Sequence, residues 1–454
     1  MKPNSSMSRN LLRSAAILFG GSGLSSLIVL LSTLWLTRLY APSEFNDLAI
    51  FASFVGVIAS AACLRFDIAL TIPEQERRAN ALLVLALLSS FGISITLAVL
   101  ISIMPKSWEW IFGTTGKWRM AWLLPLGIWM TSSYSAIQYW LVRKKKFALL
   151  SKYKIFQTLA GVSVQILIGE LGGGAVGLML GQIMISGISS LALVFWFAGA
   201  VSSYSVGAWP KILYVTFRQY KFFPKYSVPE SLLNMAGIQV PVILIGTLLL
   251  NSEAAYLFLA TRIMQAPMAL MGMSISQLYL SEAPKAMREN RLPDLTISVI
   301  KGLLRVGVGP LLLAGLLAPA LTPLIFGSNW ARSGTAMLYL TPWFVMQFLS
   351  SPISMALQVT KNQKAALVLQ GFGFFLRVGF VIVGVCFVPQ SAIELYAASG
   401  FIFYFVYFLL LMKICGIGIA RLIAEVKKEV ILLFVALLLG SLTFLAASSG
   451  LRRS

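Results

Sequence analysis

The sequence contains no histidine, only three cysteines, and few charged residues: 11% of its 454 residues are charged, whereas 58% are hydrophobic. The missing histidine excludes a catalytic base or metal site built on imidazole. Cys63, Cys386 and Cys415 show no CxxC spacing, so we expect them to pack as small apolar side chains without a disulfide framework. A soluble domain carries about 25% charged residues. The chain is therefore predicted to lie in lipid.

Long apolar segments alternate with short loops along almost the whole chain. A helix needs about 20 apolar residues to cross the hydrocarbon of a bilayer. This criterion predicts an all-α, polytopic transmembrane bundle of 12–14 helices. The predicted spans are Ser14–Trp35, Leu48–Ile72, Ala81–Ile103, Ala121–Leu141, Ile155–Leu171, Val176–Val201, Val228–Leu250, Ala254–Leu280, Leu303–Phe326, Ala336–Gln358, Ala365–Phe387, Ala392–Met412 and Val430–Ala447.

The longest interruption between spans divides the chain into halves with equal numbers of helices. Residues 1–201 are predicted to form one six-helix lobe and residues 228–413 a second. The linker 202–227 mixes basic and aromatic residues, which suits a short helix on the cytoplasmic membrane surface. Residues 414–454 are predicted to form a basic linker and an extra C-terminal helix.

Lys and Arg are distributed unevenly between successive loops. Most of the 36 basic residues fall on one side of the membrane when the N-terminus is placed in the cytoplasm. Because cytoplasmic loops carry an excess of Lys and Arg, we expect a cytoplasmic N-terminus. The net charge of +21 is interpreted as this topology signal together with attraction to anionic membrane lipid. No nucleic-acid partner is expected.

Four stretches of sequence resemble one family of membrane proteins. They are Thr37–Phe45, Leu64–Pro73, Phe223–Asn234, and Phe326–Trp330 followed by Pro342-Trp343-Phe344. In this order they are similar to the Wzx-type flippases of the polysaccharide transport family, within the multidrug/oligosaccharidyl-lipid/polysaccharide (MOP) exporter superfamily. Asn46 departs from the pattern, which has Gly after the Glu-Phe pair, but Asn also tolerates turn conformations.

The resemblance implies two six-helix lobes around a central cavity and a function in the bacterial inner membrane. It implies that oligosaccharide repeat units linked to undecaprenyl pyrophosphate pass from the cytoplasmic to the periplasmic leaflet by alternating access, for assembly of surface polysaccharide such as O-antigen or capsule. A polysaccharide polymerase is a candidate partner. We expect a monomer with no enzymatic activity, no cofactor and no metal.

Arginines within the predicted spans are candidates for binding this cargo. Arg377 lies midway along its span, Arg262 lies within the outer half of its span, and Arg65 precedes the end of the span predicted to reach Ile72. A charged residue inside a membrane costs about 2.5–3.5 kcal/mol on insertion scales. Guanidinium stays charged and binds phosphate oxygens in a bidentate way, so the three could hold a pyrophosphate. The alternative is that they pair with carboxylates or extend to the interface.

Two carboxylates are candidates for ion coupling or gating. Asp67 and Glu230 lie near the inner ends of predicted spans, where a change of protonation or binding of Na⁺ could couple transport to an H⁺ or Na⁺ counter-ion. Asp67 is two residues from Arg65, so the two point to different sides of a helix. Glu230 has an alternative explanation, because a negative charge stabilises a helix N-terminus.

Two other functions fit the same composition. A cation or multidrug exporter on the same architecture would favour acidic and aromatic cavity residues, whereas buried arginines suit an anionic cargo. A membrane glycan polymerase would show a large outer loop or an Asp-rich motif, and the longest predicted outer loop, about Pro105–Met120, contains one carboxylate, Glu109. Both are therefore less favoured than a flippase.

Overall fold

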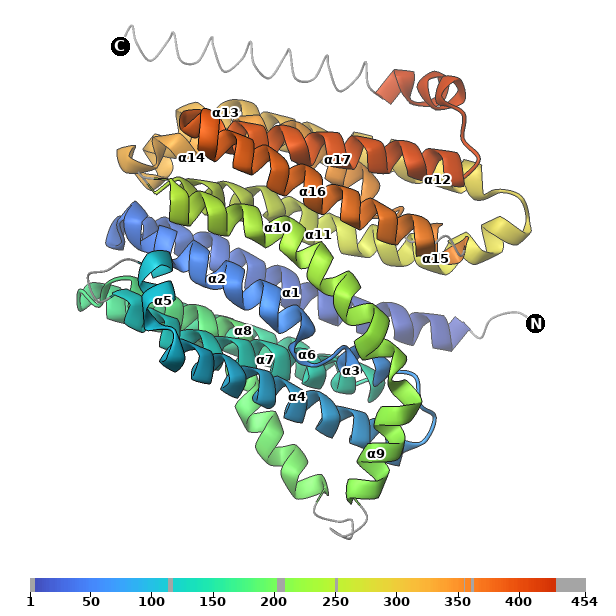
Figure 1. Cartoon of the computed structure of the whole chain (residues 1–454). Coiled ribbons are helices and arrows are strands. Elements are labelled where there is room, and N and C mark those ends of the chain that lie inside the picture. The colour runs from blue at the N-terminus through green and yellow to red at the C-terminus, as the bar shows by residue number, and fades with distance from the viewer. Residues whose placement is uncertain are drawn as a thin grey trace, which may run out of the picture. The chain divides into compact units, whose positions relative to one another are not determined.

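The computed structural model describes residues 5–112, 117–201, 209–249, 252–354, 356–360 and 363–429. These residues are almost entirely helical and contain no β-strand, which confirms the predicted all-α fold (Figure 1). The predicted thirteenth span, Val430–Ala447, lies outside the described residues. Grouping by internal contacts divides the chain into two compact units, residues 1–258 with 381–389 and residues 259–380 with 390–454.

Helices occupy each of the first twelve predicted span positions. The helices are α1 (Ser5–Leu39), α2 (Pro42–Ala62), α3 (Phe66–Ala69), α4 (Glu76–Ile103), α5 (Pro105–Phe112), α6 (Leu123–Arg143), α7 (Phe147–Glu170), α8 (Gly174–Val201), α9 (Trp209–Tyr220), α10 (Val228–Leu248), α11 (Glu253–Arg288), α12 (Leu292–Leu303), α13 (Gly309–Phe326), α14 (Ala331–Ser350), α15 (Ala356–Val359), α16 (Gln363–Phe387) and α17 (Ala392–Ile414). Short π-helices at Phe223–Ser227 and Leu304–Val308 precede α10 and α13.

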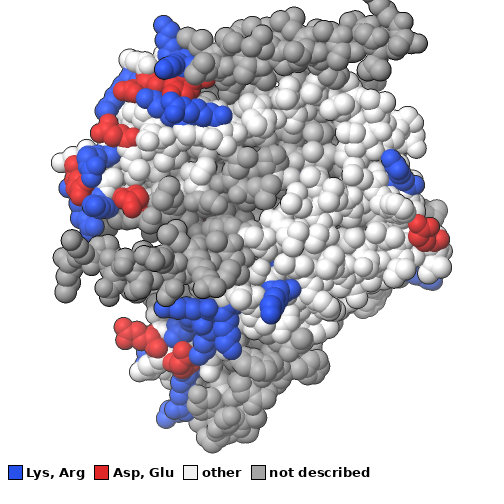
Figure 2. Space-filling model, turned by 180° about the vertical axis from the view of Figure 1, so that it is seen from behind, with Lys and Arg blue, Asp and Glu red and all other residues white. Residues whose placement is uncertain are grey.

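Eight described segments are long and apolar enough to cross a membrane. They are Gly20–Leu39, Pro42–Ala62, Glu76–Ile103, Gly174–Leu191, Phe223–Leu248, Leu292–Phe326, Leu367–Phe387 and Pro389–Ile414. The protein is therefore a multi-pass membrane protein. On the face seen in Figure 2, Lys, Arg, Asp and Glu occupy a small part of the described surface, and most of that surface is uncharged.

The predicted span Leu48–Ile72 is wrong at both ends. The helix starts earlier, at Pro42, where the Ala41 amide donates to the Glu44 carboxylate (2.7 Å). It ends at Ala62, because Leu64 and Arg65 adopt left-handed dihedrals with φ of 49° and 60°. The prediction assumed that a helix starting at Leu48 had to continue to Ile72 to cross the bilayer. The 21 residues of α2 are already about 31 Å long at 1.5 Å per residue.

Two later spans also differ from their predicted ranges. The segment predicted as Leu303–Phe326 is the end of a longer helical run, in which a π-helix joins α12 to α13. The segment predicted as Ala336–Gln358 begins at Ala331, and α14 ends at Ser350 before a turn and the short α15. Pro352 lies in this turn. Its nitrogen carries no hydrogen, and at this position it does not have to donate a helical hydrogen bond.

Polar side chains join the helices of the first unit. Gln165 is fully buried on α7, and its side-chain amide donates to the Leu178 carbonyl on α8 (3.0 Å). The Tyr40 hydroxyl donates to the backbone carbonyl of Gln165 (2.6 Å). Gln165 therefore joins helix to helix. Gly161 and Gly181 let α7 and α8 approach closely, since a Cβ on either would lie 2.5 Å from the other's carbonyl oxygen.

A row of hydrogen bonds runs along the contact between α2 and α10. Three residues of α2 spaced by seven each reach α10, because seven residues are close to two turns of an α-helix. The Asn46 amide donates to the Gly246 carbonyl (3.1 Å), Ser53 donates to the Gln239 side chain (3.0 Å), and the Ser231 hydroxyl donates to the Ser60 carbonyl (3.2 Å). Gln239 therefore also serves helix packing.

Ion pairs show which loops lie at the same end of each unit. In the first unit, Lys144 after α6 pairs with Glu76 at the start of α4 (2.5 Å). In the second unit, Arg332 at the start of α14 pairs through both nitrogens with Glu394 at the start of α17 (2.6 and 3.2 Å). Each pair places the two loops that it joins at the same end of their unit.

Three ion pairs hold the helix formed by residues 419–429 against the run from α12 to α13. Arg421 pairs with Asp294 (2.6 Å), Lys301 with Glu425, and Arg305 with Glu429 (2.6 Å). Residues 421, 425 and 429 are four apart and so lie on one face of their helix. We call this group of six residues the charged clasp.

We expect the clasp to loosen in acid. Hydrogen bonds from Lys301 and Arg305 lower the pKa of Glu425 and Glu429 respectively below the ordinary value of 4.5. A carboxylate with a lowered folded pKa stabilises the fold above its ordinary pKa, and this contribution is lost as the pH falls through the folded value. Amide hydrogen exchange of residues 419–429, corrected for intrinsic rates, should therefore rise below about pH 4.5 and in high salt.

At neutral pH, Lys301→Gln should raise exchange in the same segment. Lys427→Gln is the matched control, because Lys427 is exposed on the same helix and belongs to no described ion pair. Equal exchange in both variants would contradict a role for the clasp.

Candidate functional site

Asp67 lies on α3, the short helix that follows α2, and is buried, with 5% of its surface exposed. Its Oδ2 accepts a hydrogen bond from the Ser135 hydroxyl on α6 (3.0 Å). Its Oδ1 is buried and forms no hydrogen bond with the residues that the structure describes. Around it pack Cys63, Phe66 and other apolar side chains of one buried cluster. A carboxylate oxygen without a hydrogen bond remains an acceptor for a cation or a donor group.

Arg65 is placed beside Asp67 by the left-handed backbone that ends α2. Its side chain is partly buried, and among the described residues no ion pair joins it to Asp67. The expectation that the two point to different sides of one helix does not apply here, because α2 ends before them. The structure thus brings Arg65 and Asp67 into one turn, at the end of α2 instead of inside a continuous helix.

Glu230 lies on the first turn of α10, and its side chain is exposed. The alternative explanation for this residue was a free helix N-terminus. However, the π-helix Phe223–Ser227 leads directly into α10, and Ser227 has right-handed helical dihedrals. The backbone amides near Glu230 therefore follow a preceding helical turn and are not the free amides of a helix N-terminus, which weakens that explanation.

Arg377, midway along α16 in the second unit, is enclosed by aromatic rings. Only 2% of its surface is exposed. Its guanidinium carbon lies 4.2 Å from the centre of the Phe403 ring, 5.6 Å from that of Trp343 and 5.7 Å from that of Tyr404. Its Nε is buried and forms no hydrogen bond with any described residue. The positive charge is thus stabilised by cation–π contacts, and no described carboxylate pairs with it.

Two glycines allow this arrangement of rings. A Cβ at Gly373 on α16 would lie 2.5 Å from the Phe403 ring, and a Cβ at Gly400 on α17 would lie 2.1 Å from the Trp343 ring. Trp343 also meets Tyr396 edge to face, with ring centres 5.0 Å apart. We call Trp343, Tyr396, Phe403 and Tyr404 the aromatic cage of Arg377.

Arg262 lies on α11 and is partly buried. It belongs to the same unit as Arg377 but to a different helix. Of the predicted site residues, Arg262 and Arg65 are therefore partly accessible, Glu230 is exposed, and Asp67 and Arg377 are enclosed.

A family model described as "polysaccharide biosynthesis protein" matches residues 35–334, which is most of the chain. The chain belongs to this family. The match covers α2 to α13 in full, so it includes Arg65, Asp67, Glu230 and Arg262, whereas Arg377 and its aromatic cage lie beyond it. No curated protein matches the sequence.

Solved transporter structures share the fold. The lipid II flippase MurJ in an inward closed conformation aligns over 93% of this chain and 92% of its own, with a TM-score of 0.66 at 15% identity. An inward-facing multidrug resistance transporter of the MATE family aligns over 88% and 98%, with a TM-score of 0.65 at 18% identity.

A MOP superfamily transporter from Pyrococcus furiosus aligns over 88% of this chain and 94% of its own, with a TM-score of 0.56 at 18% identity. The reverse polarity of the binding pocket in that transporter suggests a different function for it. At these identities the three likenesses show the fold, which is that of the MOP superfamily transporters.

The sequence did not reveal the partners of the two buried charges. Ser135 is one of several serines on α6, and nothing in its spacing from Asp67, 68 positions earlier, indicated their hydrogen bond. The aromatic cage was also missed, although Trp343, Tyr396, Phe403 and Tyr404 all lie on spans that were predicted. The signal that would have indicated the aromatic cage is a lone arginine on one span between two spans that are rich in aromatic residues.

Replacing Gly400 by alanine should destabilise the second unit. The new Cβ would overlap the Trp343 ring, and overpacking of this kind costs typically about 1–3 kcal/mol. Gly379→Ala on α16 is the control, because a Cβ there meets no atom within 4 Å. Thermal unfolding of the purified protein in detergent should show a lower midpoint for Gly400→Ala and an unchanged midpoint for Gly379→Ala. The reverse order would contradict the described packing.

Proposed function

We propose that this protein is a flippase that moves undecaprenyl-pyrophosphate-linked oligosaccharide repeat units across the bacterial inner membrane. Its product would be the periplasmic lipid-linked unit used to assemble a surface polysaccharide. The family match carries this proposal, because the family belongs to polysaccharide biosynthesis and the fold is that of membrane transporters. With the N-terminus in the cytoplasm, the basic ends of both units would face the cytoplasm.

The arginines support an anionic cargo. A guanidinium inside a membrane segment costs about 2.5–3.5 kcal/mol on insertion scales, so its retention calls for a partner or a function. A pyrophosphate offers oxygens that match the planar fork of arginine. Arg262 and Arg65 are partly buried, and we propose that they contact the pyrophosphate first.

Arg377 would contact the cargo only after its aromatic cage has rearranged. In the described state, the cage covers the guanidinium almost completely. Alternating access requires such local rearrangements between inward-facing and outward-facing states. The cage would then stabilise the charge while no cargo is bound.

Asp67 is the proposed coupling carboxylate, with Glu230 as a second candidate. The free Oδ1 of Asp67 could hold a proton or Na⁺, while Ser135 fixes Oδ2. Glu230 is exposed on the first turn of α10, where a counter-ion could contact its carboxylate.

A cation or multidrug exporter is the alternative function. The structural likeness to MATE transporters fits it, but this likeness concerns the fold. Three arginines among the membrane-associated helices oppose a cationic cargo by like-charge repulsion.

The flippase proposal can be tested in a strain that lacks the gene. We expect lost surface polysaccharide and lipid-linked repeat units that accumulate facing the cytoplasm, because translocation is the step removed. Complementation with the intact gene is the control. Normal polysaccharide without an accumulated intermediate, in a strain without a second flippase, would contradict the proposal, and sensitivity to toxic cations would then support the exporter.

Arg262→Met should reduce complementation by about tenfold or more if the guanidinium holds the pyrophosphate, since hydrogen bonds to charged groups contribute about 1.5–3 kcal/mol. Arg78→Met, on the exposed start of α4, is the matched control and should complement fully. Immunoblotting of membranes must show equal protein levels. Full complementation by Arg262→Met would exclude the proposed contact.

Asp67→Asn should uncouple transport from ion gradients. Asparagine keeps an oxygen that can accept the Ser135 hydrogen bond but can neither ionise nor neutralise Na⁺. In vesicles containing the full chain, we expect transport by the wild type to respond to an imposed H⁺ or Na⁺ gradient and transport by Asp67→Asn to lose this response. An unchanged response would remove Asp67 from the coupling role and leave Glu230 to be tested in the same way.

A further inference from the structure

The helical run from α9 through the π-helix into α10 has one buried side. Thr216 and Tyr220 are buried, and α9 packs against α4 of the first unit. Tyr220 belongs to the same apolar cluster as Phe66 and Trp140. On α9 itself, Phe217 meets the Phe66 ring edge to face, with centres 5.8 Å apart. This side fixes α9 to the rest of its unit.

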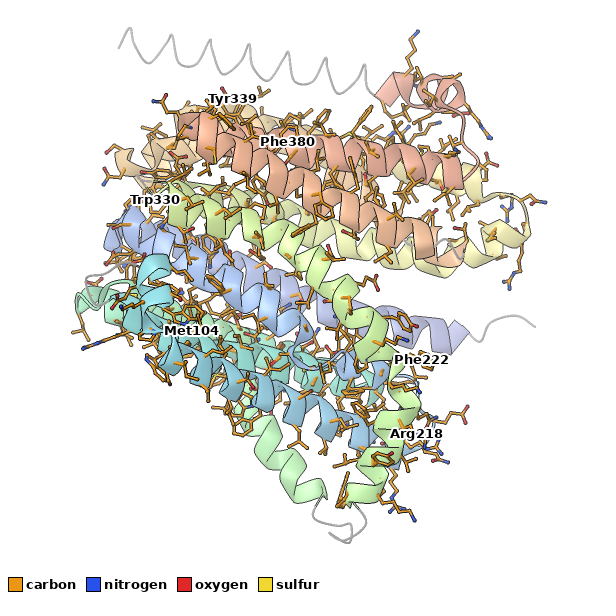
Figure 3. All side chains as sticks on the ribbon, viewed as in Figure 1. Met104, Arg218, Phe222, Trp330, Tyr339 and Phe380 are labelled. Carbon is orange, nitrogen blue, oxygen red and sulfur yellow. The ribbon has the colours of Figure 1, made fainter. Side chains whose placement is uncertain are left out.

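The opposite side of the run carries a basic stripe. Lys211 and Arg218 are seven residues apart on α9, which places them on one side of that helix. Lys221 and Lys225 follow in the turn and the π-helix that lead into α10. All four are exposed. Figure 3 labels Arg218 and Phe222 along this run.

No acidic residue neutralises the stripe from its own segment. The sequence from Trp209 to Pro229 contains neither Asp nor Glu. Among the described residues, none of the four basic side chains forms an ion pair. The stripe therefore presents a net positive charge to whatever covers it.

Aromatic side chains border the stripe. Tyr214, Phe222 and Tyr226 are 65%, 59% and 58% exposed. Phe222 and Tyr226 stack with ring centres 6.1 Å apart, and the Lys225 ammonium lies 5.0 Å from the centre of the Tyr226 ring. Exposed aromatic rings next to basic side chains are typical of the headgroup region of a membrane, where the rings meet acyl chains and the charges meet phosphates.

The position of the stripe along the chain also indicates lipid. The segment Phe223–Leu248 is apolar and long enough to span the bilayer, and two residues, Lys221 and Phe222, separate it from α9. The stripe therefore lies at the end of a membrane span, at the depth of the lipid headgroups. A soluble acidic protein would not need the exposed rings at this depth.

We propose that the stripe of Lys211, Arg218, Lys221 and Lys225 is a binding surface for the headgroups of anionic phospholipids. The phosphates contact the four cations, and the aromatic side chains insert between the acyl chains. The proposal does not depend on the identity of the cargo.

The test measures phosphatidylglycerol bound to the purified full chain, with phosphatidylcholine as the comparison lipid. Native mass spectrometry in detergent gives the apparent affinity of each lipid. Near an anionic surface each basic residue contributes about 1 kcal/mol, or about fivefold in affinity. The variant Lys211→Gln/Arg218→Gln/Lys225→Gln should therefore bind phosphatidylglycerol at least about tenfold more weakly, with phosphatidylcholine binding unchanged.

Two further variants separate this surface from net charge and from misfolding. Arg77→Gln/Arg78→Gln/Lys152→Gln removes the same charge from other exposed positions of the first unit and should change phosphatidylglycerol affinity by less than about twofold. Lys211→Arg/Arg218→Lys/Lys225→Arg keeps the charge and should retain the wild-type affinity.

In nanodiscs, amide exchange of residues 209–226 in the wild type should slow when phosphatidylglycerol replaces part of the phosphatidylcholine, and added salt should reverse this effect. The proposal is overturned if the first variant binds phosphatidylglycerol as tightly as the wild type, or if the two charge-removing triple variants lose affinity equally. Amide exchange in the wild type that is the same in both lipids would also overturn it, whether or not any variant folds.

Discussion

The absence of hydrogen-bonding partners in lipid is the constraint on which the rest of the structure depends. A polar group on a membrane helix must find its partner within the protein or serve a function. The bonds from α2 to α10 and the two bonds of Gln165 meet this requirement with neutral groups. They fix the rotation and height of each helix more strictly than apolar contacts would, because a hydrogen bond is directional.

Close approach of the backbones makes these bonds reachable. At Gly161 and Gly181 the backbones of α7 and α8 approach closely, and Tyr40 reaches the Gln165 carbonyl beside Gly169 and Gly177. Association of helices in lipid gains little from the hydrophobic effect, so packing of small residues and interhelical hydrogen bonds must supply the stability. The same logic applies to Gly373 and Gly400, which admit the rings around Arg377.

The sequence predicted most helices because a span of about 20 apolar residues is set by bilayer thickness alone. It failed where the backbone turns for a local reason. No glycine or proline indicates the left-handed residues Leu64 and Arg65 that follow the apolar helix α2, so the predicted span continued to Ile72. The site was predictable only as a set of isolated charges. Ser135, the partner of Asp67, lies 68 residues away along the chain, and the rings around Arg377 lie up to 34 residues away. The pattern of a single sequence carries no information about such pairs.

The two enclosed charges are stabilised in different ways, and the difference bears on what each can do. A carboxylate partner would cancel the charge of Arg377, whereas aromatic rings offset its desolvation and leave the charge in place. Asp67 has one oxygen held by a neutral hydroxyl and the other free, so its charge is likewise not cancelled. Uncancelled charges are costly in a purely structural role. An anion at Arg377 and a cation or proton at Asp67 would each relieve that cost, which is the energetic reason to connect these two residues with cargo and counter-ion.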